Sequence, residues 1–276
     1  MGRLAELAST LRARGERPLV PFLTAGYPDA ERCRAALRGV QESGCALVEL
    51  GVPFSDPVAD GPVIQAASQR SLAQGTTPGA ALELAAWATT ELGLSVALMG
   101  YLNPILRQGE RAFAAAAAQA GVVGVIVPDL PHEEAGGLRG ELAAREVDLV
   151  SLVAPTTEPD RLRRIAVAAD GFLYLVSVAG VTGGATGVGE GLEDYVARVR
   201  AACRLPLYVG FGVGTPGQAA RVAACADGVI VGSALLRRLA DAADTDDARA
   251  RARAFCAGLL AAMAPGDGPG GKDGST

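Results

Sequence analysis

The sequence predicts a single (β/α)8 barrel of the TIM type, and three observations support this fold. Eight short apolar runs alternate along the chain with alanine-rich stretches of helical periodicity. The runs are almost continuously apolar, as expected for parallel strands that are buried on both faces. The length of 276 residues, half of them apolar, suits one barrel domain of about 250 residues. No glycine-rich dinucleotide fingerprint follows the first run, which weakens the alternative of an open doubly wound sheet.

The expected elements follow one another in a regular order. An extra N-terminal helix is expected within residues 1–18, where charged and apolar residues alternate at helical spacing. The strands are expected within residues 18–26, 46–53, 95–104, 122–131, 148–157, 171–183, 206–214 and 227–234. The helices after them are expected within residues 29–44, 78–93, 109–121, 133–147, 158–170, 192–205, 215–226 and 246–263. Asp29, Glu158 and Thr215 stand where helix caps or first-turn acids belong.

The same pattern predicts the domain organisation. Residues 1–264 are expected to form the barrel domain, and residues 265–276, rich in glycine and without a means of packing, a disordered tail. The connections after the second and sixth strands, roughly residues 53–78 and 180–192, are the long ones. Long loops at the C-terminal face of a barrel are usually lids or partner surfaces.

Composition excludes several classes of function. A net charge of −5 leaves no electrostatic footprint for nucleic acid. No basic amphipathic segment favours a membrane surface, and no apolar run is long enough for a membrane-spanning helix. The N-terminus lacks the apolar core of a signal peptide, so we expect a cytoplasmic protein. The five cysteines are widely spaced and odd in number, as expected for small core residues: Cys33, Cys45, Cys203, Cys225 and Cys256.

Two residue types are nearly absent. The only lysine is Lys272, in the tail, so no lysine is offered for Schiff-base chemistry in the barrel. The only histidine is His132, which excludes a metal site built on several histidines. A single histidine that follows a proline in a loop is more often solvated than catalytic. No metal is therefore expected.

Glu49 is the first candidate for a general acid or base. It lies inside the apolar second strand, where a buried carboxyl group without a partner responds with a raised pKa. Asp56 and Asp60 follow in a loop that could fold back over the strand end and complete a carboxylate pair. The alternative is that Glu49 merely caps a neighbouring helix.

Other polar residues end strands at the face where barrel enzymes carry their active sites. They are Tyr101, Asn103, Asp129 and Tyr174. Glycines near the ends of the last strands, with one from the loop after the sixth, would let backbone N–H groups approach a phosphate. These phosphate-binding candidates are Gly183, Gly212, Gly232 and Ser233. The alternative is that the glycines only permit tight turns.

Five motifs resemble the tryptophan synthase alpha subunit family. They are PFLTAGYPD, VELGVPFSDPVADGPVIQ, IVPDLP, AGVTG and GFGVGTP, and the resemblance spans residues 18–262. It implies a barrel lyase that cleaves indole-3-glycerol phosphate to indole and glyceraldehyde 3-phosphate in tryptophan biosynthesis. With no barrel lysine and no metal set, such a retro-aldol cleavage must use the indole ring itself as its electron sink.

The resemblance also implies roles for individual residues. Glu49 matches the family's catalytic glutamate, Asp60 its aspartate partner, and Tyr174 a tyrosine near the substrate. Thr182 matches the threonine through which the loop after the sixth strand closes on Asp60. Residues matched to the substrate pocket and the phosphate site are Phe22, Phe211, Gly183, Gly212, Gly232 and Ser233. We also expect Tyr101 to contact the substrate.

The resemblance further implies a beta subunit partner that carries pyridoxal phosphate, in an alpha-beta-beta-alpha heterotetramer. This chain has no room for a domain that binds that cofactor, so none is expected within it. Segments 53–57 and 103–107 and Pro131 match the partner surface. The loop after the sixth strand departs from the family pattern because it is unusually glycine-rich and lacks an arginine. A standalone indole-releasing lyase, a noncatalytic activating subunit and another phosphosugar enzyme remain alternatives.

Overall fold

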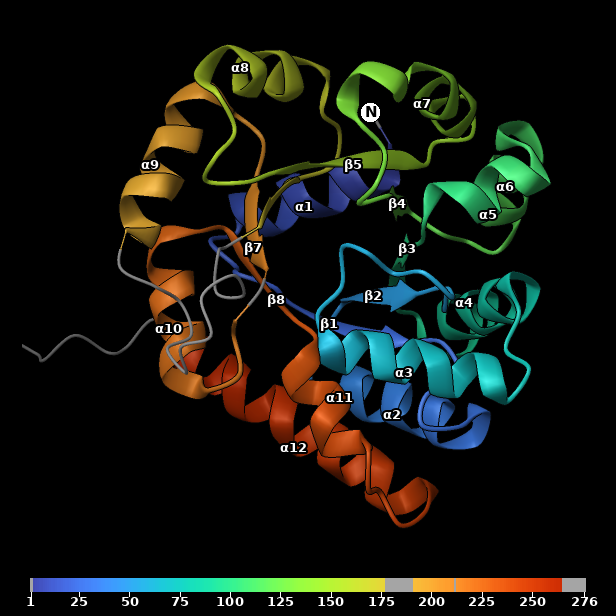
Figure 1. The fold of residues 1–276 in the computed structure, drawn as a ribbon. Coiled ribbons are helices and arrows are strands. Elements are labelled where there is room, and N and C mark those ends of the chain that lie inside the picture. Colours follow the sequence, from blue (N-terminus) through green and yellow to red (C-terminus); the bar gives the residue numbers. More distant parts are fainter. Residues whose placement is uncertain (1, 177–190, 211, 265–276) are drawn as a thin grey trace, which may run out of the picture.

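Eight parallel strands form a closed barrel in sequential order, from β1 to β8 and back to β1 (Figure 1). The computed structural model describes residues 2–176, 191–210 and 212–264. The strands are β1 (Leu19–Thr24), β2 (Leu47–Gly51), β3 (Ser95–Met99), β4 (Gly124–Ile126), β5 (Asp148–Val153), β6 (Leu173–Val176), β7 (Leu207–Gly210) and β8 (Gly228–Val231). Leu19 of β1 pairs with Val229 of β8, which closes the barrel. The predicted fold class is therefore confirmed.

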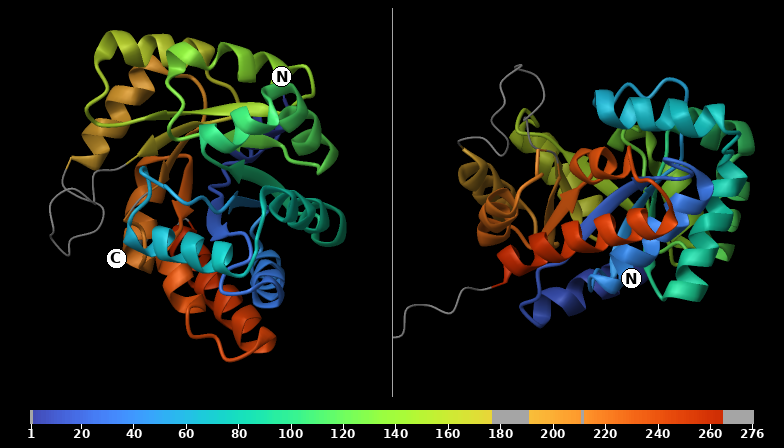
Figure 2. Two further views of the ribbon diagram at one scale, coloured as in Figure 1. Left: turned by 45° about the vertical axis from the view of Figure 1, so that its right-hand side comes forward. Right: turned by 90° about the horizontal axis from the view of Figure 1, so that it is seen from below.

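The helices surround the barrel (Figures 1 and 2). They are α1 (Arg3–Ala13), α2 (Ala30–Glu42), α3 (Pro62–Ala73), α4 (Pro78–Leu92), α5 (Leu102–Gln108), α6 (Glu110–Gln119), α7 (Gly136–Ala143), α8 (Pro159–Ala168), α9 (Leu192–Ala202), α10 (Pro216–Cys225), α11 (Ser233–Leu239) and α12 (Thr245–Met263). A short 3-10 turn, η1 (His132–Glu134), precedes α7. Helices α3, α5 and α11 lie in segments where the sequence analysis expects loops or strand ends.

The local rules of helix capping hold at two predicted positions. The Asp29 carboxylate accepts a hydrogen bond of 2.9 Å from the backbone N–H of Arg32 at the start of α2. Thr215 and Gln218 form a reciprocal capping box at the start of α10. Glu158 occupies the cap position of α8 without a side-chain hydrogen bond to the helix.

The hydrophobic core has two parts. One lies between the barrel and the helices, and the other fills the barrel interior. Inside the barrel, the rings of Phe172 and Tyr208 stack with their centroids 4.2 Å apart. Four of the five cysteines, all except Cys225, are buried, as expected for core residues. Within the described part of the chain, no helix is long and apolar enough to cross a lipid bilayer.

Helix α1 covers the N-terminal end of the barrel. Its Leu4 is fully buried and packs with the barrel-interior cluster. A Cβ on Gly124 would lie 2.4 Å from the Leu4 side chain, so this glycine of β4 makes room for it. The buried Asp148 of β5 accepts a hydrogen bond of 2.9 Å from the backbone N–H of Ala5. The opposite end of the barrel is therefore the open one.

Truncating Leu4 is expected to destabilise the whole barrel. Leu4→Ala should lower the free energy of unfolding by about 2–5 kcal/mol, because it leaves a cavity in a filled interior. Denaturant unfolding followed by circular dichroism measures this change. The matched control is Leu106→Ala, at a leucine that is 55% exposed. Equal unfolding midpoints for the two variants would show that the burial of Leu4 does not stabilise the barrel.

Candidate active site

Glu49 lies at the centre of β2 with its side chain toward the barrel interior. It is 2% exposed, and its Oε2 has no hydrogen-bond partner among the described residues. Burial raises the pKa of Glu49 to about 8, and the nearby charge of Asp60 adds to this rise. Near neutral pH this carboxyl group is therefore mostly protonated, and it can give or accept a proton.

Asp60 comes from the loop that follows β2 and faces the same space. Burial raises its pKa to about 6, while a hydrogen bond from the Tyr101 hydroxyl opposes the rise. That bond joins the Tyr101 hydroxyl to Oδ2 of Asp60 over 3.0 Å, and the same hydroxyl accepts a 3.1 Å bond from the backbone N–H of Ala59. Oδ1 of Asp60 has no partner among the described groups. Asp60 is thus held in place and mostly ionised at neutral pH.

Tyr174 of β6 borders the same carboxyl groups. It is buried, and burial together with the charges of Glu49 and Asp60 raises the pKa of its hydroxyl well above the usual value. A Cβ on Gly210 of β7 would lie 2.3 Å from the Tyr174 hydroxyl oxygen. The glycine therefore leaves the space that the tyrosine ring occupies.

A cavity of about 1170 Å³ opens at the C-terminal end of the barrel and contains these groups. Glu49, Asp60 and Tyr174 line one part of it. Apolar side chains form much of the remaining wall: Phe22, Ile64, Met99, Ile126, Leu152, Val176 and Ile230. Such an apolar cavity with a few converging polar groups is typical of a small-molecule binding site.

Backbone groups of the last two βα connections line another part of the cavity. Gly212, with a positive φ of 78°, Gly232 and Ser233 are among the lining residues. Gly232 precedes the first turn of α11, where backbone N–H groups are free of helical partners. Arg237, one turn further along α11, also lines the cavity. Free N–H groups and an arginine make this region suitable for a phosphate.

The structure gathers some predicted residues and separates others. Phe22, Glu49, Asp60, Tyr174, Gly212, Gly232 and Ser233 all line the large cavity. Tyr101 does not line it and reaches it through its bond to Asp60, while its ring stacks on Phe54 at 5.1 Å. The predicted residues Thr182, Gly183 and Phe211 lie outside the described residues.

Two carboxylates among the candidates face elsewhere. Asp129 accepts a 2.9 Å hydrogen bond from the backbone N–H of Leu102 and so holds the start of α5. Asp56 is exposed, and its carboxylate accepts a hydrogen bond from the Ser55 hydroxyl. His132 is partly exposed in η1, while its Nδ1 is shielded from solvent and has no partner among the described groups.

Sequence reasoning missed Arg237, Thr156 and Thr157, which line the cavity. The spacing of four residues between Ser233 and Arg237 is the signal that could have placed both on one face of a helix. In the described ranges, no group of three or more His, Cys, Asp or Glu side chains is arranged to hold a metal ion.

Comparison with known proteins identifies the family of this chain. The sequence profile of the family described as Tryptophan synthase alpha chain matches residues 8–264. The tryptophan synthase alpha chain of Gloeobacter violaceus is 49% identical over 243 residues, which are 88% of each chain. That of Chloroflexus aurantiacus is 44% identical over 96% of this chain and 99% of its own.

Solved structures give the same result. A crystal structure of tryptophan synthase from M. tuberculosis is similar with a TM-score of 0.85 and 36% identity, over 95% of this chain and 99% of that one. The tryptophan synthase subunit alpha of Legionella pneumophila str. Paris is similar with a TM-score of 0.86 and 38% identity, over 95% and 98% of the two chains. The chain belongs to the tryptophan synthase alpha chain family.

Proposed function

We propose that Glu49 and Asp60 carry out the lyase reaction of this family, the cleavage of indole-3-glycerol phosphate to indole and glyceraldehyde 3-phosphate in tryptophan biosynthesis. One observation carries the assignment. A fully buried carboxyl group with a pKa of about 8 and a second with a pKa of about 6 line one largely apolar cavity. Two carboxyl groups whose pKa values are pushed apart are suited to separate roles.

Glu49 is the general acid and then the general base. As the neutral acid it protonates ring carbon C3 of the indole, which turns the ring into an electron-accepting indolenine cation. As the carboxylate it removes the proton of the glycerol hydroxyl next to the scissile bond. The electrons of the C–C bond then return to the ring, indole leaves, and the former hydroxyl carbon becomes the aldehyde. Glu49 has then given one proton and taken up one, so it ends the reaction as the neutral acid.

Asp60 stabilises the positive charge that develops on the ring. Its ionised carboxylate is oriented by Tyr101 and still has Oδ1 unpaired among the described groups, so it can accept a hydrogen bond from the indole N–H. A fixed negative charge in a largely water-free site stabilises a cationic transition state more strongly than it would in water. Tyr174 packs beside both carboxyl groups as part of the pocket wall.

We expect a bell-shaped pH dependence of kcat/KM for the free chain. Activity should rise as pH increases through about 6, where Asp60 ionises, and fall as pH increases through about 8, where Glu49 loses its proton. The measurement is the initial rate of indole release between pH 5 and pH 9.5. In Tyr101→Phe the acid limb should move to higher pH, because Tyr101 stabilises the Asp60 carboxylate. An unmoved acid limb would exclude Asp60 as its source.

The phosphate site is proposed to combine backbone N–H groups with the charge of Arg237. Side chains on a helix lean toward its N-terminus, so Arg237 is directed toward Ser233 and Gly232. No ion pair or hydrogen bond of the Arg237 side chain occurs among the described residues. The neighbouring Arg238 also lines the cavity, and its guanidinium lies over the ring of Phe255 at 4.6 Å.

Arg237→Gln should raise KM for indole-3-glycerol phosphate about tenfold and leave kcat within about twofold, because the phosphate is bound equally in the ground and transition states. Steady-state kinetics at low ionic strength measure both constants. Arg253→Gln is the matched control, since it removes the same charge at an exposed position of α12 that does not line the cavity. Equal effects of the two variants would indicate only a general electrostatic contribution.

The family implies a beta subunit partner. We infer an alpha-beta-beta-alpha heterotetramer in which the beta subunit carries the pyridoxal phosphate and this chain carries no cofactor. The exposed Val58 and Leu106, which are 81% and 55% exposed, lie in segments near the active-site face and support a partner surface there. A cytoplasmic location stays a prediction from the sequence.

The test of the proposed function is indole release from indole-3-glycerol phosphate by the purified chain, with and without a cognate beta subunit. Slow release that the beta subunit raises strongly is the expected result. Fast release by the isolated chain would favour a standalone lyase. The absence of release under both conditions would contradict the proposed roles of Glu49 and Asp60 and leave a noncatalytic role.

A further inference from the structure

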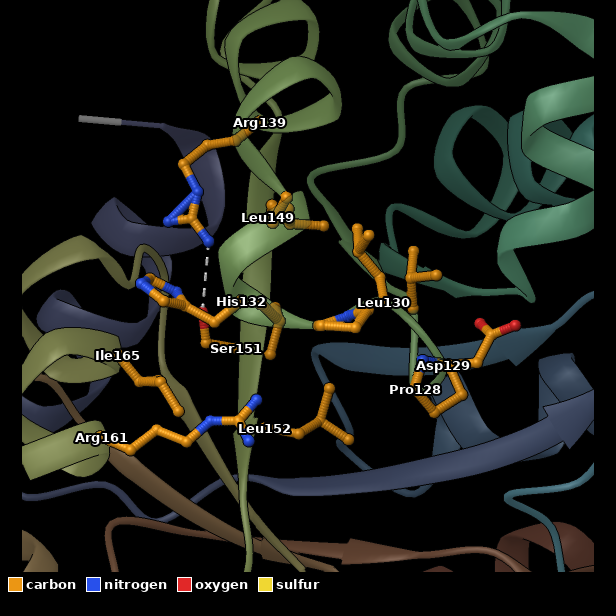
Figure 3. Close-up of a pocket in the computed structure, with 14 residues that line it drawn as sticks. Pro128, Asp129, Leu130, His132, Arg139, Leu149, Ser151, Leu152, Arg161 and Ile165 are labelled. Carbon is orange, nitrogen blue, oxygen red and sulfur yellow. Dashed lines mark hydrogen bonds between the residues drawn. The ribbon is translucent and has the colours of Figure 1, made fainter. Parts of the chain in front are cut away.

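A second, smaller pocket lies beside the active-site cavity, between the ends of β4 and β5 and the helices α7 and α8 (Figure 3). Its volume is about 300 Å³. Pro128, Leu152, Arg161 and Ile165 line both cavities, so they form the wall between them. The proposed lyase reaction makes no use of this pocket.

Five polar side chains line the pocket, and all of them except Asp129 can donate hydrogen bonds. Arg139 of α7 donates to the Ser151 hydroxyl over 3.5 Å and to the backbone carbonyl of Ala168. Figure 3 shows the Arg139 guanidinium above Ser151 and the His132 ring beside the Ser151 hydroxyl. Arg161 of α8 extends along the opposite wall and pairs with the half-exposed Glu133 at 3.1 Å. The set offers hydrogen-bond donors from four separate elements: η1, α7, β5 and α8.

One ring nitrogen of His132 lacks a hydrogen-bond partner in this pocket. Its Nδ1 is shielded from solvent and has no partner among the described groups. A buried polar atom without a partner costs free energy unless a ligand or a water molecule satisfies it. The unpaired Nδ1 is therefore available to a ligand in the pocket.

The charges around the pocket favour an anion. Burial and the positive charges of Arg139, Arg161 and Arg164 lower the pKa of His132, and they outweigh Glu133, which acts in the opposite direction. Asp129 also lines the pocket, but its Oδ1 accepts the N–H of Leu102 and its carboxylate points away from His132 in Figure 3. An anion would satisfy the arginines and favour a proton on the unpaired Nδ1.

We propose that the pocket formed by His132, Arg139, Ser151 and Arg161 binds a small phosphate-type oxyanion, separately from the phosphate end of the active site. The guanidinium groups and the Ser151 hydroxyl donate hydrogen bonds to the oxyanion, and His132 takes up a proton and donates from Nδ1. Because Arg161 also lines the active-site cavity, occupancy of this pocket changes the charge at the wall of the catalytic site. The proposal does not depend on the lyase mechanism.

The experiment uses the chain's single histidine as its reporter. The imidazole NMR signals of the full chain are followed from pH 4.5 to pH 9, in inorganic phosphate and in sodium chloride of equal ionic strength. Phosphate should raise the pKa of His132 by about 1, which corresponds to about tenfold tighter binding to the protonated form. A pKa of His132 that is the same in phosphate and in chloride would overturn the proposal.

Variants locate the bound phosphate. Arg161→Gln should weaken the phosphate response of His132 at least about tenfold, since it removes a charged donor at an exposed position. The control is Arg163→Gln on the same helix, whose guanidinium pairs with Asp160 and does not line the pocket. Arg237→Gln, changed in the active-site cavity, should also keep the response. A response that survives in Arg161→Gln, or that is lost in Arg237→Gln, would contradict a separate site.

Discussion

Glu49→Gln is expected to lower kcat for indole release about a hundredfold to ten thousandfold while the chain stays folded. Glutamine has nearly the shape of the protonated glutamic acid but cannot give or take a proton. The loss is that of general acid–base catalysis, which typically contributes this much. Since Glu49 acts in both proton transfers of the proposed mechanism, no other described group can replace it fully. The measurement is single-turnover release of indole at pH 7.

Folding and substrate binding provide the controls for this variant. The neutral amide fits a buried position where the carboxyl group is already protonated near neutral pH, so the unfolding midpoint should not fall. Glu83→Gln, on the exposed face of α4, removes a carboxylate far from the cavity and should retain full activity. If Glu49→Gln keeps more than a tenth of the original kcat, Glu49 is not the acid–base group.

The barrel was predictable because its strands are encoded by short, almost continuous runs of apolar residues. The run that forms β1 is buried at all six positions and is apolar at each of them except Thr24. Helix α3 was not predicted, because its buried residues are the small or polar Ala67, Ser68 and Ser71. They carry no apolar periodicity, so this helix is defined by Pro62 at its start and by packing rather than by pattern.

The candidate site was predictable from the sequence where a charged residue lies within an apolar segment. Glu49 is conspicuous as a carboxyl group in an apolar strand. Asp56, Asp60 and Asp129 cannot be ranked by their positions in the sequence alone, since each is an aspartate near a strand end. The family resemblance singles out Asp60, and the fold gives the physical reason, because it places Asp60 on the cavity and joins Asp129 to the start of α5. The pairing of Tyr101 with Asp60 spans 41 positions and leaves no local signal.

Asp60→Asn is expected to lower kcat/KM about a hundredfold or more. Asparagine can still accept the hydrogen bond from Tyr101, so the side chain keeps its place, but the negative charge that balances the indolenine cation is lost. Tyr101→Phe keeps that charge and should cost less, about tenfold. In the double variant the two losses should not add, because Tyr101 acts through Asp60.

The pH profile of Asp60→Asn separates this electrostatic role from simple damage to the pocket. The charge of Asp60 is one cause of the raised pKa of Glu49, so its removal should shift the alkaline limb to lower pH. The acid limb near pH 6 should disappear, because no carboxylate remains there to ionise. A variant that merely distorted the pocket would lose rate equally at every pH. If the alkaline limb does not move and the acid limb persists, then the charge of Asp60 does not raise the pKa of Glu49 and Asp60 is not the source of the acid limb.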